Sequence, residues 1–281
     1  MLGQTVSQWI NRLSLDKDKL AFWKENGYLV LPGLFSKEET AAVKKLVETI
    51  FKNKVGNFKT VIDIYINRGY RRVHLNDCPD DAELETFKLN DLFLEHDLIR
   101  QIALNQTLTK YLREFLHGDP MLCNSLNFNY SSQQGFHTDS LYMTPPKDLN
   151  LAAAWIALED CHPDSGPLEY YPGSHLIPPY LFSNGAMSSI PSEMDSYVEY
   201  MNSEIAKRNL KVEQFLPKEG DCLIWHCQLF HAGGKINNPQ LTRKSLVTHY
   251  FRNGDYDCAT NNISSNRFWM DRIQQEVNTK N

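Results

Sequence analysis

The sequence predicts an α+β protein in which N-terminal helices pack on one sheet of a jelly-roll, cupin-like core. Two observations predict this class. Apolar residues recur at helical spacing up to about residue 118, and short β-branched or aromatic runs punctuated by Gly, Pro and Asp come after them. The 281 residues contain no repeat, low-complexity tract or Pro/Gly-rich linker, so we expect a single domain over residues 1–281.

The first predicted helices have recognisable ends. Residues 16–26 indicate a short helix that stops at Asn26-Gly27, and a short strand comes next in YLVLPGLF. Ser36 and Glu39 have the spacing of a capping box. The helix behind them has one apolar face, formed by Val43, Leu46, Val47, Ile50 and Phe51.

Two further helices are predicted at roughly 82–95 and 97–116, so the helical part covers about residues 1–118. The jelly-roll core is expected over about 119–255, and a C-terminal extension over about 256–281. Strands are expected in the runs MLCNSLNFNY, LAAAWIALED, GPLEYYPGSH, DCLIWHCQLFH and RKSLVTHYF. The polar, partly helical residues 180–212 indicate an excursion over one end of the sandwich.

Composition excludes several classes of function. The net charge of −5 and the absence of a basic run argue against a nucleic-acid partner. The chain has no apolar run near the ~18 residues of a membrane span and no secretory signal, so no membrane partner is expected. Six cysteines without a CxxC pair are typical of reduced thiols, which favours a cytoplasmic protein. We expect a monomer or a weak homodimer.

The stretch QQGFHTDSLY places His137 and Asp139 two positions apart. On an extended strand such residues point to the same face, so an imidazole and a carboxylate would share one space. An iron site of the facial-triad type needs one more imidazole. His231, at the end of an apolar strand before Gly233-Gly234, is the favoured third ligand. His226 lies within that strand and is interpreted as a hydrogen-bonded core histidine.

Arg243 lies 12 residues after His231, across the loop AGGKINNPQLT. A hairpin of this length would return Arg243 beside the metal, on a strand adjacent to that of His231. A guanidinium is a planar fork that binds a carboxylate bidentately. Arg243 is therefore the candidate for binding the distal carboxylate of a dicarboxylate cosubstrate. Without the metal motif, it would be interpreted as a surface arginine at a strand start.

Together these motifs resemble the phytanoyl-CoA dioxygenase family of non-haem iron, 2-oxoglutarate-dependent oxygenases. The resemblance runs from NGYLVLPGLFSKEE near residue 26 to VTHYF at 247–251. Its most specific pieces are HTD, WIALEDCHPDSGPLEYYPGSH, GDCLIWHCQLFHAGG and the strand from Arg243. The resemblance implies a double-stranded β-helix, with Fe(II) bound by His137, Asp139 and His231. It also implies that Arg243 binds the C5 carboxylate of 2-oxoglutarate.

The resemblance implies further contacts to the cosubstrate. Gln134 matches a glutamine that lies three residues before the first histidine, and Trp155 matches an aromatic position lining the same pocket. Ser174 lies where the family adds a polar contact. Trp155 and Ser174 are equally compatible with core and turn positions. Gly233 departs from the pattern, because some relatives have a serine there that helps hold the cosubstrate.

The implied reaction consumes 2-oxoglutarate and O2, releases succinate and CO2, and hydroxylates a substrate. Halogenating relatives have a small residue in place of the carboxylate, so Asp139 argues for an oxygenase. Desaturation, cyclisation or epimerisation at the same site are alternatives. A cupin-like binding module with a structural metal is an alternative from another class. Arg243 and the open coordination positions argue against it, since structural metal sites are usually closed.

The primary substrate is expected to be a small or medium-sized, anionic metabolite. In YINRGYRRVH, residues 65–74, Arg71 is the candidate for binding an anionic group, although a solvated loop with surface arginines is the plainer interpretation. Tyr142, just beyond the metal motif, is expected at the mouth of the site. Asn127 and Tyr130 are expected to project into the barrel.

Overall fold

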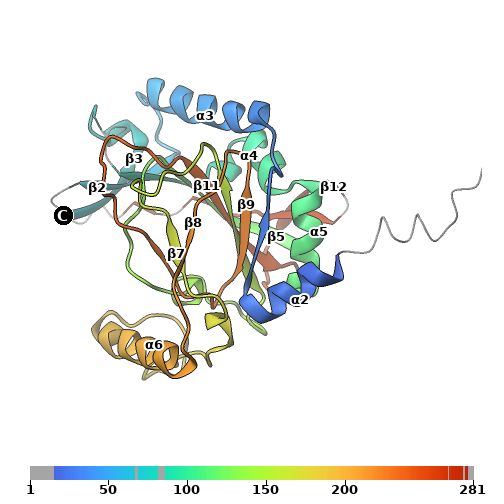
Figure 1. The fold of residues 1–281 in the computed structure, drawn as a ribbon. Coiled ribbons are helices and arrows are strands. Elements are labelled where there is room, and N and C mark those ends of the chain that lie inside the picture. Colours follow the sequence, from blue (N-terminus) through green and yellow to red (C-terminus); the bar gives the residue numbers. More distant parts are fainter. Residues whose placement is uncertain (1–15, 67–68, 82–85, 265, 275, 278–281) are drawn as a thin grey trace, which may run out of the picture.

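The computed structural model describes residues 16–66, 69–81, 86–264, 266–274 and 276–277 (Figure 1). Its helices are α2 (Lys17–Asn26), α3 (Lys37–Lys52), α4 (Asp97–Ala103), α5 (Gln106–Phe115) and α6 (Met194–Arg208). The strands of the N-terminal half are β1 (Tyr28–Leu31), β2 (Val61–Ile66), β3 (Gly69–His74), β4 (Phe87–Asn90) and β5 (Pro120–Phe128). Those of the C-terminal half are β6 (Leu151–Ala157), β7 (Leu168–Tyr170), β8 (Glu213–Phe215), β9 (Cys222–His226), β10 (His231–Gly233), β11 (Ser245–Arg252), β12 (Thr260–Ser264) and β13 (Arg267–Met270).

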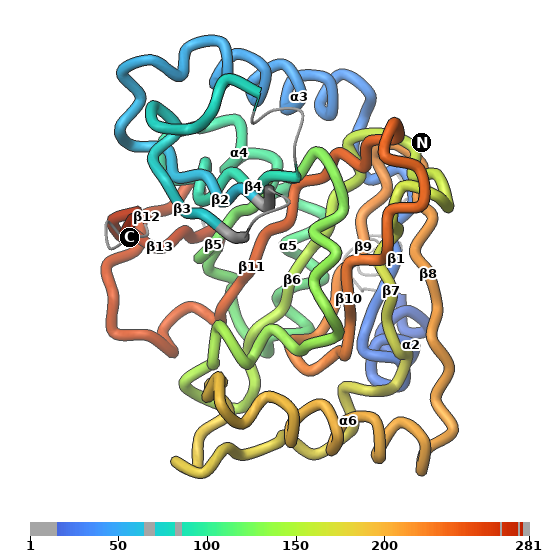
Figure 2. Tube along the Cα trace, turned by 90° about the vertical axis from the view of Figure 1, so that its left-hand side faces the viewer, coloured from blue at the N-terminus to red at the C-terminus, as the bar shows by residue number. Residues whose placement is uncertain are grey.

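Two sheets form the jelly roll. The larger sheet has the strand order β1-β9-β6-β11-β5-β4-β2-β3, and β13 pairs parallel to β5. The smaller sheet has the order β10-β7-β8. Figure 2 shows α3 across one end of the strands and α6 across the other. The predicted α+β jelly roll is confirmed.

Strand β6 shows how the layers are held together. Successive side chains of a strand point to opposite faces of the sheet. Trp155 packs with Leu168 and Phe215 of the smaller sheet, whereas Ala154 and Ile156 belong to the core that the helices share. All seven residues of β6 are buried, because both faces of the strand are covered.

The helices α2 and α3 are confirmed. Gly27 ends α2 with a left-handed φ of 76°, a conformation that favours glycine. Ser36 and Glu39 form the predicted capping box at the start of α3. The face of α3 that is buried against the core includes Val43, Ile50 and Phe51.

The helix predicted at 82–95 is wrong. Residues 82–85 lie outside the described residues, and the remainder forms β4 and a 3-10 turn at Leu92–Leu94. Phe87 and Leu89 are buried on either side of the half-buried Lys88, which is the alternation of a strand. The helix predicted at 97–116 is instead α4 and α5, because the Asn105 side chain caps a new helix. Strands β2 and β3 form a hairpin where a loop was expected.

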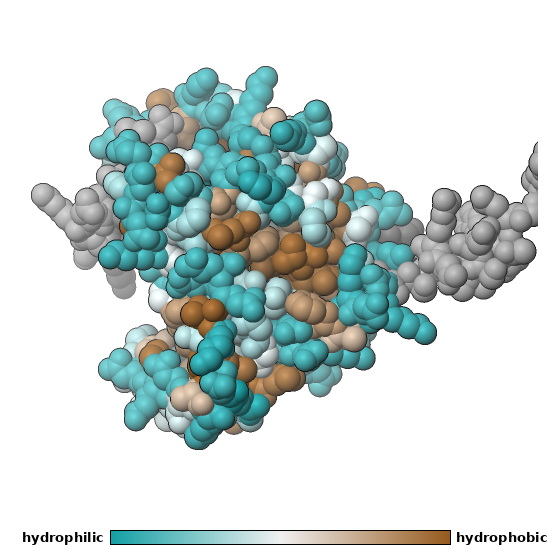
Figure 3. All heavy atoms as spheres, viewed as in Figure 1, coloured by the Kyte–Doolittle hydropathy of each residue, from teal (hydrophilic) through white to brown (hydrophobic). Residues whose placement is uncertain are grey.

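On the face shown in Figure 3, the surface over the strands differs from the surface over α3. Figure 3 shows hydrophobic side chains gathered across the middle of one face, over the strands, and hydrophilic ones over α3. Within the described ranges, no helix is long and apolar enough to cross a membrane. All six cysteines are free thiols, and four of them are buried.

Candidate metal and cosubstrate site

Three buried side chains converge between the two sheets. His137, Asp139 and His231 each offer one ligand atom, and these atoms lie within 4.8 Å of one another. His137 and His231 face each other across an antiparallel bridge with backbone hydrogen bonds of 2.9 and 3.0 Å. Asp139 opens a 3-10 turn, so the motif is a strand-like bridge joined to a turn. The predicted grouping of the three side chains is confirmed.

Hydrogen bonds prepare both imidazoles for a metal ion. Nδ1 of His137 lies 2.8 Å from the Gly135 carbonyl oxygen, and Nδ1 of His231 lies 2.9 Å from that of Leu229. A carbonyl only accepts, so each Nδ1 carries the proton and each Nε2 keeps a free lone pair. Burial, and then the neighbouring His231, lower the pKa of His137 to about 3, so its ring is neutral at neutral pH.

Asp139 is oriented by Trp225 and His249, two residues that no sequence motif predicted. The Trp225 indole Nε1–H donates to Asp139 Oδ2 at 2.8 Å, and His249 Nε2 lies 3.7 Å from the same oxygen. Oδ1 lies 3.7 Å from His231 Nε2. One oxygen is therefore held by the protein while the other faces the histidines. Burial raises the pKa of Asp139, but His231 and His249 outweigh burial and hold this pKa below its usual range.

His249 is itself fixed by a buried polar chain. Its Nδ1 lies 3.0 Å from Asn124 Oδ1, and Asn124 Nδ2 donates to Asp91 Oδ1 at 2.9 Å. Asp91 in turn forms an ion pair of 2.8 Å with Arg272 near the end of the described chain. A chain of four residues, His249, Asn124, Asp91 and Arg272, therefore supports the carboxylate that faces the metal position.

The donor set fits a non-haem Fe(II) ion. Two imidazole nitrogens and one carboxylate oxygen are the ligands of a facial triad, which leaves open positions for other ligands. The two free Nε2 lone pairs and the free Asp139 Oδ1 meet this requirement without rearrangement of their hydrogen bonds.

A narrow pocket of about 80 Å³ joins the triad to Arg243. Arg243 is 3% exposed, and within the described residues its Nε and Nη1 have no hydrogen-bond partner. The guanidinium carbon lies 5.6 Å from the centre of the Trp155 ring. Burial lowers the pKa of Arg243 to about 10, so it remains a cation at neutral pH. A buried cation without a partner calls for an anionic ligand.

Arg243 does not reach the pocket in the way predicted. The expectation of adjacent strands is wrong, because His231 begins β10 of the smaller sheet whereas Arg243 precedes β11 of the larger sheet. The loop between them crosses from one sheet to the other. The Arg243 N–H donates to the Asn129 carbonyl at 2.7 Å, which fixes the backbone where the side chain enters the pocket.

Of the other three residues predicted to contact the cosubstrate, two line the pocket and one does not. Gln134 and Trp155 line the pocket. Ser174 is not among the lining residues, and its Oγ accepts a hydrogen bond of 2.8 Å from the Phe230 N–H. The Ser174 hydroxyl is therefore used to hold the chain just before His231. A Cβ on Gly233 would lie 2.9 Å from the backbone nitrogen of Gln133, so a larger residue at this position would require the loop to shift.

Of the residues predicted at the substrate, only Tyr142 lies near the metal ligands. Its ring centre is 5.6 Å from that of His137, and the residue is 57% exposed. Asn127 and Tyr130 do not line the metal pocket but a separate cavity, because Phe128 between them takes the inward position on β5. Arg71 is exposed on the edge strand β3.

His226, the alternative third ligand, lies outside the metal cluster. Its ring centre is 5.5 Å from that of His175, and its Nδ1 accepts a hydrogen bond of 3.1 Å from the Gln228 N–H. This agrees with its interpretation as a hydrogen-bonded core histidine.

Comparison with protein families gives a match over most of the chain. The family model described as Phytanoyl-CoA dioxygenase (PhyH) matches residues 23–245. A curated relative from Rattus norvegicus, "Phytanoyl-CoA dioxygenase, peroxisomal", is 26% identical over 277 residues, which cover 95% of this chain and 75% of the rat protein.

Two solved structures with the same fold come from nogalamycin biosynthesis. The non-heme alpha ketoglutarate dependent carbocyclase SnoK has a TM-score of 0.62 and 16% identity, and the match covers 85% of each chain. The corresponding epimerase SnoN has a TM-score of 0.61 and 16% identity, with 86% of this chain and 84% of that chain covered.

Proposed function

The chain belongs to the phytanoyl-CoA dioxygenase family, and on this premise we propose that it hydroxylates a small or medium-sized, anionic metabolite. It is an Fe(II)/2-oxoglutarate-dependent oxygenase with the facial triad His137, Asp139 and His231. When bound, the iron and 2-oxoglutarate supply the oxidising chemistry, in which O2 is consumed and succinate and CO2 are released.

The observation that carries the proposed cosubstrate site is the buried guanidinium of Arg243 in the pocket of the triad, whose Nε and Nη1 have no hydrogen-bond partner among the described residues. Its Nε–H and Nη1–H would donate to the distal carboxylate of 2-oxoglutarate. The Trp155 indole Nε1 is also buried without a partner within the described residues, and we assign it a second contact in this pocket. Gln134, exposed at the rim, would close the outer side.

Hydroxylation is favoured over halogenation because Asp139 keeps its carboxylate in place. The Trp225 hydrogen bond holds that carboxylate toward the histidines, which leaves no position for a halide on this side. The folds of SnoK and SnoN host ring closure and epimerisation, so these outcomes are the second candidate for the present site.

The substrate would approach at the mouth, since a pocket of about 80 Å³ has room for little beyond the cosubstrate. Tyr142 is the proposed mouth residue, because it is exposed and lies against the His137 ring. Arg71 is proposed to meet the anionic group of the substrate, and Arg71→Ala would test this by a loss of apparent substrate affinity.

A metabolite screen tests the proposed reaction. Purified enzyme with Fe(II), 2-oxoglutarate and O2 is incubated with small anionic metabolites, and substrate-dependent succinate is measured. We expect a product that has gained one oxygen atom. A product that has lost two hydrogen atoms would show desaturation or ring closure instead, and an isomer of unchanged mass would show epimerisation. Asp139→Ala is the matched inactive control.

We further propose a monomer or weak homodimer of the cytoplasm. The six free thiols suit a reducing compartment. Hydrophobic side chains gather across one face in Figure 3, and such a face would support weak self-association. Size-exclusion chromatography over a range of protein concentrations, together with cell fractionation, tests both statements.

A further inference from the structure

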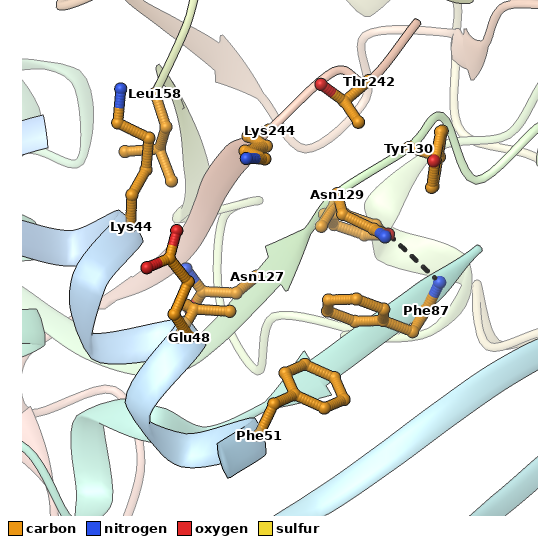
Figure 4. A pocket seen from close by; sticks show the side chains of 12 residues that line it. Lys44, Glu48, Phe51, Phe87, Asn127, Asn129, Tyr130, Leu158, Thr242 and Lys244 are labelled. Carbon is orange, nitrogen blue, oxygen red and sulfur yellow. Dashed lines mark hydrogen bonds between the residues drawn. The ribbon is translucent and has the colours of Figure 1, made fainter. Parts of the chain in front are cut away.

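A second cavity lies between helix α3 and strand β5 (Figure 4). Its volume is about 230 Å³. The lining residues that matter here are Lys44, Glu48, Phe51, Phe87, Asn127 and Lys244. None of these six lines the pocket of the iron ligands, although Phe128 borders both cavities, so the proposal made here does not rest on the proposed function.

Asn127 gives this cavity its clearest signal of a ligand. The residue is 1% exposed, and within the described residues neither its Nδ2 nor its Oδ1 has a hydrogen-bond partner. Buried side-chain polar atoms are nearly always paired, because an unpaired one loses its hydration without compensation. The amide therefore calls for a ligand that offers an acceptor and a donor side by side.

The cavity has an apolar end and a cationic end. Figure 4 shows Phe51 and Phe87 at one end and Lys44 and Lys244 toward the other, with Asn127 between them. The two aromatic rings lie 4.7 Å apart between centres. A ligand that fills the cavity must therefore be apolar at one end and anionic at the other.

The charges around the cavity define the ligand further. Lys44 is neutralised by Glu219 at 2.7 Å. Across the described part of the chain, Lys244 and the exposed Glu48 enter no ion pair, so one cation and one anion remain for a ligand. A zwitterionic ligand has one positive and one negative group to pair with these two side chains, and it brings no net charge into the cavity.

We propose that this cavity binds an apolar α-amino acid of about the size of leucine. The carboxylate would pair with Lys244 and the ammonium group with Glu48. Asn127 would donate through Nδ2 to the carboxylate and accept through Oδ1 from the ammonium group. The side chain would lie against Phe51 and Phe87. The volume of about 230 Å³ lies below the roughly 300–1,000 Å³ of sites for drug-sized ligands, which is consistent with a ligand as small as an amino acid.

Titration calorimetry with L-leucine tests the proposal. The full-length protein is loaded anaerobically with Fe(II) and 2-oxoglutarate, so that the iron site is occupied. Asn127→Leu removes both hydrogen-bonding groups at similar volume, and Lys244→Met removes the charge at similar length. Lys45→Met is the matched control, because Lys45 is an exposed residue of α3 outside the cavity lining.

We expect wild type and Lys45→Met to bind leucine equally. Asn127→Leu and Lys244→Met should bind at least roughly tenfold more weakly, a difference of about 1.4 kcal/mol. Isocaproate, which lacks the ammonium group, and isoamylamine, which lacks the carboxylate, should bind wild type more weakly by a similar factor. Asn127→Leu should also unfold at a higher temperature than wild type, since its unpaired buried amide is gone.

Three results would overturn the proposal. The first is no binding of leucine to wild type at concentrations near its solubility. The second is unchanged leucine affinity in Lys244→Met, which decides the question even if Asn127→Leu does not fold. The third is leucine binding that disappears in Asp139→Ala, which would place the amino acid at the iron site instead.

Discussion

Replacing Arg243 by lysine tests the proposed cosubstrate site. Lysine keeps the positive charge but loses the planar fork that holds both oxygens of a carboxylate. One charge-assisted hydrogen bond contributes roughly 1.5–3 kcal/mol. Since about 1.4 kcal/mol is a tenfold change in affinity, the dissociation constant for 2-oxoglutarate should rise about 10- to 150-fold.

Arg243→Met separates cosubstrate binding from folding. Burial lowers the pKa of Arg243 from its usual range to about 10. At about 1.4 kcal/mol per pH unit, the buried cation destabilises the cosubstrate-free fold by on the order of 3 kcal/mol. The folded-state pKa is the lower one, so this penalty is fully present below about pH 10 and fades as the pH rises toward the unfolded-state value. Arg243→Met should therefore raise the free energy of unfolding while abolishing 2-oxoglutarate binding.

Two measurements check these expectations. Anaerobic titration of 2-oxoglutarate at saturating Fe(II) gives the dissociation constants, and denaturant unfolding without cosubstrate gives the stabilities. Arg71→Lys is the matched control, because Arg71 is an exposed arginine on an edge strand. An unchanged constant in Arg243→Lys, or a raised one in Arg71→Lys, would refute the assignment of the carboxylate to Arg243. A large loss of stability in Arg243→Met would show that the guanidinium serves the fold.

The remaining predictions concern the metal position. His137→Ala, Asp139→Ala and His231→Ala should each lose iron binding and turnover while keeping the circular dichroism spectrum of the fold. His226→Ala should keep both iron binding and turnover. Loss of iron in His226→Ala together with iron binding in His231→Ala would show that His226 is the third ligand. Asp139→Gly should lose hydroxylation without efficient chlorination, as judged by mass spectrometry with added chloride; robust chlorinated product would contradict this. Trp225→Phe removes the 2.8 Å hydrogen bond to Asp139 and should weaken iron binding roughly 10- to 100-fold; unchanged iron affinity would mean that the indole only packs.

The elements that the sequence predicted correctly are those with local signals. These signals lie at the ends of the helices themselves: the capping box of Ser36 and Glu39 begins α3, and Gly27 ends α2. The prediction of a helix at 82–95 was wrong because the short β4 depends on its pairing with β2 and β5, and the alternation of four residues is too short to distinguish a strand from a helix. Tertiary pairing overrides local preference in such a segment.

The metal ligands were predictable because HTD and His231 form a recognisable motif. The two residues that orient Asp139 were not predictable from the sequence. Trp225 and His249 reach Asp139 only because β9 and β11 both place a side chain on the inner face of the larger sheet. The prediction that Asn127 projects into the barrel was wrong for a related reason. Alternate residues of a strand point to opposite faces, and the sequence does not show which set of residues faces the barrel.

The proposed function requires that the triad and Arg243 together bind Fe(II) and 2-oxoglutarate. Adding both anaerobically to the apoprotein and recording the visible spectrum tests it most directly. We predict a weak charge-transfer band that saturates with 2-oxoglutarate in wild type and is lost in His231→Ala and Arg243→Met. Folded, iron-loaded wild-type protein that shows no band at saturating 2-oxoglutarate would contradict the claim and identify a metal-binding module without oxygenase chemistry.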